Sequence, residues 1–172
     1  MALSTQYVKL KVAGTVYCIK DFPDIDPHGE ADQIEITTLC NEFHEYIDGL
    51  KNYGDGLQFT MNYDESVFNT FTLKEYNSSS TYGVGDLIKH DGKAKKCNTA
   101  STTGTYDSTK WDDVEVNLLL CNSKDDVTGA NGKFTISACD LSVALAGAGV
   151  GDALEMVLTI RPKSSIEFAV VS

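Results

Sequence analysis

The chain has 172 residues, of which 42% are hydrophobic and 23% charged, a balance typical of one globular domain that spans 1–172. It contains 14 Lys and Arg and 25 Asp and Glu, and the resulting net charge of −11 opposes tight binding to DNA, RNA or anionic lipid. No apolar run approaches the roughly 20 residues that cross a bilayer, and the start of the chain lacks the features of a signal peptide, so we expect a cytosolic product.

Hydrophobic alternation with a period of two recurs along the chain. Such alternation is typical of strands that bury one face, and it predicts a mainly β fold. The phase changes at Cys139-Asp140, where a β-bulge or a sharp bend would keep both halves facing the core. The alternating stretches are, in order, 8–12, 15–19, 34–36, 57–63, 114–120, 134–138, 141–145, 154–160 and 166–170.

One stretch suits a helix, and one long segment suits neither a helix nor a strand. Asp64 can cap a helix that runs to about Tyr76 and turns Val67 and Phe71 towards the core. Residues 77–110 are rich in Ser, Thr, Gly and Lys and show little periodicity, which predicts an insertion or long loop.

A calcium-loop spacing runs from Asp24 to Glu35, with Gly29 at the turn position. His28 is a poor ligand for a hard cation, and the flanking residues predict strands where such a loop needs helices. An acidic surface loop is the favoured interpretation, and we expect no metal site.

The remaining patterns do not indicate an enzyme. The five cysteines are odd in number and include no C-x-x-C pair, which favours free, mostly buried thiols. Cys40 and His44 are four apart, but no third group orients them as a catalytic dyad. The glycines at 147–151 and 85–92 fit neither a dinucleotide nor a phosphate-loop spacing. We therefore expect no catalytic residues and no cofactor.

Three blocks resemble the tail tube proteins of long-tailed phages, in pattern and in order. The first is Glu30-Ala-Asp-Gln-Ile-Glu-Ile-Thr-Thr-Leu39. The second runs from Glu45 to Asp64 and includes Gly49-Leu50-Lys51, and the third runs from Leu141 to Ile160. The three blocks lie in the family's order and contain no catalytic motif.

The resemblance implies a β-sandwich or barrel-like tail tube fold with one short helix. It implies hexameric rings that stack into a hollow tube, whose acidic lumen conducts genome DNA during ejection. The implied partners are other copies of the chain, a tail tip or initiator complex, a tail terminator and a ruler protein inside the growing tube. DNA would pass through without tight binding, no membrane would be involved, and the protein would be made in the bacterial cytoplasm and end in the virion tail.

Two sets of residues follow from this interpretation as hypotheses. Polar members of the strands would face the lumen, and the loop 48–56, the arm 1–6 and their neighbours would contact other subunits. The lumen candidates are Glu35, Thr37, Gln58, Thr60, Glu155 and Thr159. The contact candidates are Leu3, Tyr7, Leu50, Lys51 and Tyr53.

Two alternatives stay open. One is a monomeric β-sandwich that binds carbohydrate or a protein ligand, with Trp111, Tyr106 and Tyr82 as stacking platforms. The other is the inner tube of a contractile tail or of a contractile bacteriocin, which the sequence does not separate from the first interpretation.

Overall fold

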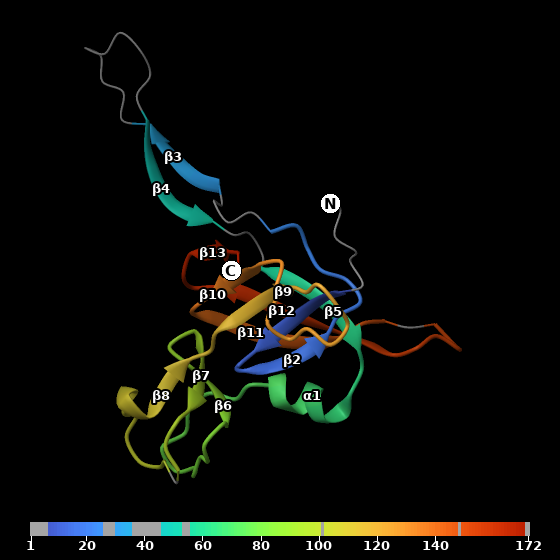
Figure 1. Cartoon of the computed structure of the whole chain (residues 1–172). Coiled ribbons are helices and arrows are strands. Elements are labelled where there is room, and N and C mark those ends of the chain that lie inside the picture. The colour runs from blue at the N-terminus through green and yellow to red at the C-terminus, as the bar shows by residue number, and fades with distance from the viewer. Residues whose placement is uncertain are drawn as a thin grey trace, which may run out of the picture.

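The structure is a computed structural model and describes residues 7–25, 30–35, 46–52, 56–100, 102–147 and 149–170. As predicted, the chain is mainly β, and these residues contain one short α-helix, α1 (Glu65–Phe71), and a 3₁₀ turn at Ser108–Lys110 (Figure 1). The strands are β1 (Val8–Val12), β2 (Thr15–Cys18), β3 (Glu30–Glu35), β4 (Tyr46–Asn52), β5 (Leu57–Asn62), β6 (Leu87–His90), β7 (Lys93–Cys97), β8 (Trp111–Asp113), β9 (Val116–Leu120), β10 (Lys133–Ile136), β11 (Cys139–Leu145), β12 (Glu155–Pro162) and β13 (Ile166–Ala169).

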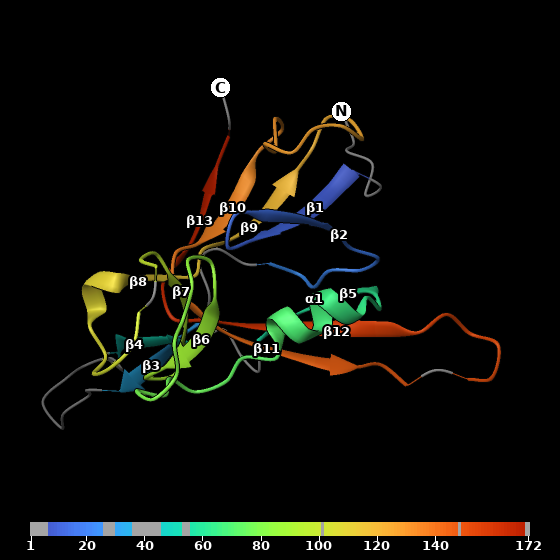
Figure 2. The same ribbon diagram turned by 90° about the horizontal axis from the view of Figure 1, so that it is seen from below.

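Two antiparallel sheets form a sandwich. The five-stranded sheet has the order β13-β10-β9-β1-β2, and the three-stranded sheet has the order β11-β12-β5. Figure 2 shows them as an upper and a lower layer, with the hairpin of β11 and β12 reaching well beyond the other strands. The core fills the space between the sheets, because alternate residues of each strand point into it.

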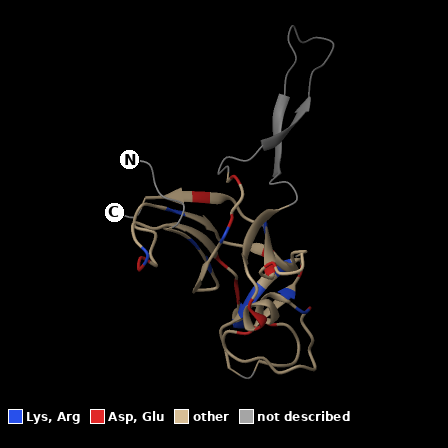
Figure 3. Cartoon of the chain, turned by 90° about the vertical axis from the view of Figure 1, so that its right-hand side faces the viewer, with Lys and Arg blue, Asp and Glu red and all other residues tan. Residues whose placement is uncertain are grey.

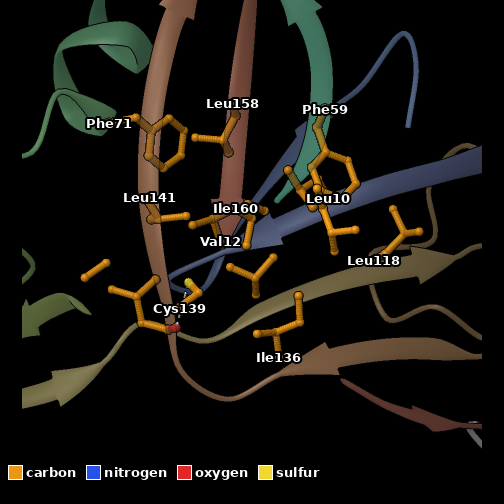
Figure 4. Packing of buried hydrophobic residues seen from close by; sticks show 14 of the residues in the cluster. Leu10, Val12, Phe59, Phe71, Leu118, Ile136, Cys139, Leu141, Leu158 and Ile160 are labelled. Atoms are coloured by element: carbon orange, nitrogen blue, oxygen red, sulfur yellow. Dashed lines mark hydrogen bonds between the residues drawn. The ribbon is translucent and has the colours of Figure 1, made fainter. Parts of the chain in front are cut away.

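The core is built from the positions that the alternation predicted. Leu10 and Val12 of β1 face Phe59 of β5 and Leu158 and Ile160 of β12 (Figure 4). All five side chains are essentially removed from solvent. Burial of side chains of this size stabilises a fold by about 1.5–3 kcal/mol each, so this contact between sheets dominates the stability.

The phase change in the sequence is a bend between the two sheets. β10 ends at Ile136 in the five-stranded sheet, and β11 begins at Cys139 in the three-stranded sheet. The Ser164 hydroxyl accepts the backbone N–H groups of Ser137 and Ala138, which holds the bend. The predicted sharp bend is therefore confirmed, and both Ile136 and Cys139 are buried.

The helix α1 begins where the sequence predicts and ends earlier. The Asp64 carboxylate accepts the backbone N–H of Val67, which satisfies one of the unpaired donors of the first turn. The predicted end near Tyr76 is wrong, because Thr72 leaves the helical conformation and donates its hydroxyl to the Phe68 carbonyl. Phe71 is buried, and its ring lies 5.3 Å from that of Tyr17 on β2.

Residues 77–110 are not one long loop. They contain β6 and β7, which join β8 in a second three-stranded unit that we call the small sheet. Asp91 and Gly92 connect β6 to β7 with φ of 52° and 68°, the left-handed values that a tight hairpin turn requires. The alternation missed this sheet because β7 reads Lys-Ala-Lys-Lys-Cys and buries only Ala94 and Cys97.

The predicted loop 48–56 is also partly wrong. Residues up to Asn52 belong to β4, which pairs with β3 in a two-stranded antiparallel sheet. Figure 1 shows this hairpin away from the sandwich. Asp48 and Gly49 hid the strand in the sequence because both residue types are depleted in strands.

Candidate functional site

The outer face of the three-stranded sheet carries four of the six lumen candidates. In the register of β5 and β12, Gln58 lies opposite Thr159 and Thr60 lies opposite Val157. Glu155 lies opposite Asn62. Glu155 is on the same face as Val157, because side chains two residues apart on a strand point to the same side. The face is polar, whereas the reverse side of the same strands forms the core.

The other two lumen candidates are not on this face. Glu35 is the last residue of β3 and is paired in register with Tyr46, in a different sheet. Thr37 lies outside the described residues.

Charges on this outer face are balanced rather than acidic. Glu155 forms an ion pair with Lys20. Asp140 of β11 accepts a hydrogen bond from Lys89 Nζ at 2.9 Å, and Arg161 Nη1 lies 3.9 Å from the same carboxylate oxygen. Each of these cations therefore has a carboxylate within 4 Å.

Four lysines lie on β6 and β7 of the small sheet, and in the described residues Lys89 and Lys95 have a carboxylate partner; the other two are Lys93 and Lys96. Lys95 forms an ion pair of 2.7 Å with Asp113, and the hydrogen bond between them raises the pKa of Lys95. Lys96 Nζ donates to the Ala13 carbonyl at 2.8 Å. Figure 3 shows basic and acidic segments side by side in this lower part of the molecule. Acidic partners therefore offset part of the positive charge of these lysines.

The aromatic residues of the small sheet pack on one another. Trp111 is only 3% exposed, and its ring lies 5.2 Å from Tyr82 and 5.7 Å from Tyr76. His90 and Tyr106 are stacked with ring centroids 3.6 Å apart. The role of Trp111 as an exposed stacking platform is therefore wrong, because this ring forms the core of the small sheet.

The contact candidates divide between described and undescribed residues. Leu50 and Lys51 lie in β4, while Leu3 and Tyr53 are outside the described residues. Tyr7 precedes β1, and its carbonyl accepts the backbone N–H of Cys121 at 3.0 Å. Tyr7 also lines a cavity of about 470 Å³ beside Val8 and Ile19.

The calcium-like spacing and the cysteines can be placed in part on the described residues. Glu30–Glu35 of the calcium-like spacing is strand β3, and the described residues contain no group of three or more candidate metal ligands. Of the described cysteines, Cys18 is exposed, whereas Cys97, Cys121 and Cys139 are buried as free thiols. Burial raises the pKa of Cys139 to about 12, which makes it a poor nucleophile. Within the described residues, no helix has the length and apolar character to cross a membrane.

The sequence analysis missed one feature, the tip of the hairpin between β11 and β12. Leu145, Val150 and Leu154 are exposed there. The glycines at 147, 149 and 151, between two alternating strands, are the signal that could have identified a protruding turn.

Comparison with known proteins identifies a shared fold. No family model matches the sequence, and no curated protein matches it. A solved structure that the chain resembles is the PVC sheath/tube terminator, in the extended state, of an extracellular contractile injection system. The match has a TM-score of 0.58 at 10% identity and covers 98% of this chain and 97% of that chain. The chain therefore has, over almost its whole length, the fold of a protein in a tail-like injection machine.

Proposed function

We propose that the chain is a structural subunit of a phage-tail-like assembly, in which copies join into hexameric rings that stack as a tube. The observation that supports this most strongly is the likeness of nearly the whole chain to a component of a contractile injection system. Sheet edges suit such an assembly because they offer unpaired backbone groups for a second copy.

The polar outer face of the three-stranded sheet is our proposed channel wall. Gln58, Thr60, Glu155 and Thr159 give it hydrogen-bonding groups, and Val157 lies among them on the same face. Lys20, Lys89 and Arg161 each have a carboxylate within 4 Å, so they would offer DNA phosphates little free positive charge. DNA would then pass along the wall without tight binding.

Assembly is tested by negative-stain electron microscopy and analytical ultracentrifugation of the purified protein over a concentration series. The proposal predicts rings, or hollow tubes whose width is constant. A protein that sediments as a monomer over the whole series would contradict it and would favour the monomeric binding module.

A second candidate function is a terminator that closes the end of a tube. The observation in its favour is that a solved structure with this fold is a sheath/tube terminator. A terminator would form single rings that bind one end of an existing tube and stop its growth. A tube subunit would polymerise through both ring faces, so the same micrographs separate the two functions.

The channel wall is tested by charge reversal. Glu155→Lys, combined with Gln58→Lys on the same face, should slow DNA ejection from particles that still assemble, since new cations would hold phosphates. Asp125→Lys, in the loop that follows β9, is the control and should leave ejection unchanged. Normal ejection kinetics in the double variant would contradict the assignment of this face to the channel.

A further inference from the structure

The hairpin of β11 and β12 carries a hydrogen-bonded turn with an apolar apex at 149–152. Gly149, Val150, Gly151 and Asp152 form a turn in which the Asp152 N–H donates to the Gly149 carbonyl at 3.1 Å. The Asp152 carboxylate in return accepts the Gly149 N–H at 3.0 Å. Gly151, at the third position, has a φ of 92°, as a type II turn requires. The turn therefore fixes its own shape and places Val150 at the apex, fully exposed.

Two other large apolar side chains flank this apex. Leu145 is the last residue of β11, and Leu154 immediately precedes β12; they are 52% and 44% exposed. Single exposed apolar residues are normal on a protein surface, but three on one projection indicate a contact site. Because two internal hydrogen bonds already hold the turn, docking it would cost little conformational entropy.

A second apolar surface lies at the β13 edge of the five-stranded sheet. Phe168 packs on Phe134 at 4.8 Å between ring centroids, yet it is 47% exposed, and Val170 after the strand is 69% exposed. Among the described strands, β13 pairs on one side only, with β10. Its other side is an open edge that can pair with a further strand.

The tip and the β13 edge lie on opposite sides of the molecule. Figures 1 and 2 both show the tip projecting on the right and β13 on the left. A surface and its complement on opposite sides generate a head-to-tail contact, which closes into a ring when the rotation between copies allows it. One contact between copies would therefore cover both apolar surfaces.

We propose that the tip of one copy docks on Phe168 and Val170 at the β13 edge of the next copy in the ring. This inference rests on the proposed ring assembly and names the surfaces that join its subunits. Charge supports a second copy as the occupant, although each chain carries −11. The only charge in 149–154 is Asp152, and Lys133 lies beside Ala169 in the register of the receiving edge. These two charges are opposite in sign and would favour the contact.

The test uses the full chain with one acidic substitution on each surface. Val150→Asp removes the apolar apex, and Val170→Asp removes the receiving surface; both positions are exposed, so the fold should survive, which circular dichroism checks. Each variant should raise the concentration at which rings form by at least about tenfold, because an unpaired charge would be buried. Val84→Asp, in the turn before β6 and 65% exposed, is the matched control and should assemble like the wild type.

Two combinations show whether the surfaces meet each other. A mixture of Val150→Asp and Val170→Asp has one intact tip and one intact receiving edge, and should form dimers that do not grow further. The double variant Val150→Asp/Val170→Lys places opposite charges at the contact and should recover rings. If the wild type forms rings and Val150→Asp assembles equally well, this inference is wrong and the proposed function stands. Wild-type protein that never assembles would instead contradict the proposed function.

Discussion

The ion pair between Asp140 and Lys89 should hold the small sheet against the sandwich. Asp140 belongs to β11, whereas Lys89 belongs to β6 of the small sheet, and their side chains meet at 2.9 Å. Asp140 is only 7% exposed, and its Oδ1 has no hydrogen-bond partner among the described residues. The substitution that tests this contact is Asp140→Asn, which keeps the size of the side chain and removes its charge.

The size of the effect follows from the burial of the two partners. Removing one partner of a fully buried pair costs about 3–5 kcal/mol, whereas an exposed pair contributes about 0–1 kcal/mol. The Lys89 side chain is 31% exposed and can regain water when its partner is lost. We therefore expect Asp140→Asn to lower the free energy of unfolding by about 1–3 kcal/mol.

The assay is a double-mutant cycle measured by urea unfolding, at concentrations where the protein is monomeric. Asp140→Asn, Lys89→Met and the double variant should give a coupling energy of about 1–2 kcal/mol. Lys93→Met is the control, because the described residues show no ion pair for Lys93. Additive losses within about 0.3 kcal/mol would refute the coupling.

Three further predictions concern stability and reactivity. Backbone N–H groups of Ala130 and its neighbours hold the pKa of Asp126 below its ordinary value of 3.8. The ionised Asp126 carboxylate therefore stabilises the fold fully above about pH 4, and this stabilisation is lost as the pH falls further. The Asp126→Asn variant should therefore lose less unfolding free energy than the wild type between neutral and acid pH, as unfolding curves at several pH values would show. Leu158→Ala should lower the free energy of unfolding by about 2–5 kcal/mol, measured in urea, because the side chain is completely buried. At pH 8 a thiol reagent should label exposed Cys18 in the folded protein and label Cys139 only after unfolding, as peptide mass spectrometry would show.

The sandwich was predictable because its strands bury one face only. In β5, Leu57, Phe59 and Met61 are buried and alternate with polar residues, so the sequence carries the period of the strand directly. The outer face of the same sheet followed from this period, which placed Gln58 and Thr60 on one side. Sequence alone did not show that Glu155 is paired, since Lys20 lies 135 residues away.

The small sheet was hidden because its core is aromatic and assembled from distant positions. Tyr76, Tyr82 and Trp111 are separated by loops and meet only in the folded chain. The Asp91-Gly92 dipeptide was the available signal, since it favours a two-residue hairpin turn. Its flanks carry too few apolar residues for the alternation to identify the strands.

The central claim is that this fold assembles into rings around a channel, and cryo-electron microscopy of the assembled protein tests it most directly. The account predicts a ring in which the outer face of the three-stranded sheet, with Gln58 and Thr159, lines a central channel. A ring whose channel is lined instead by the outer face of the five-stranded sheet, or particles without any channel, would contradict it.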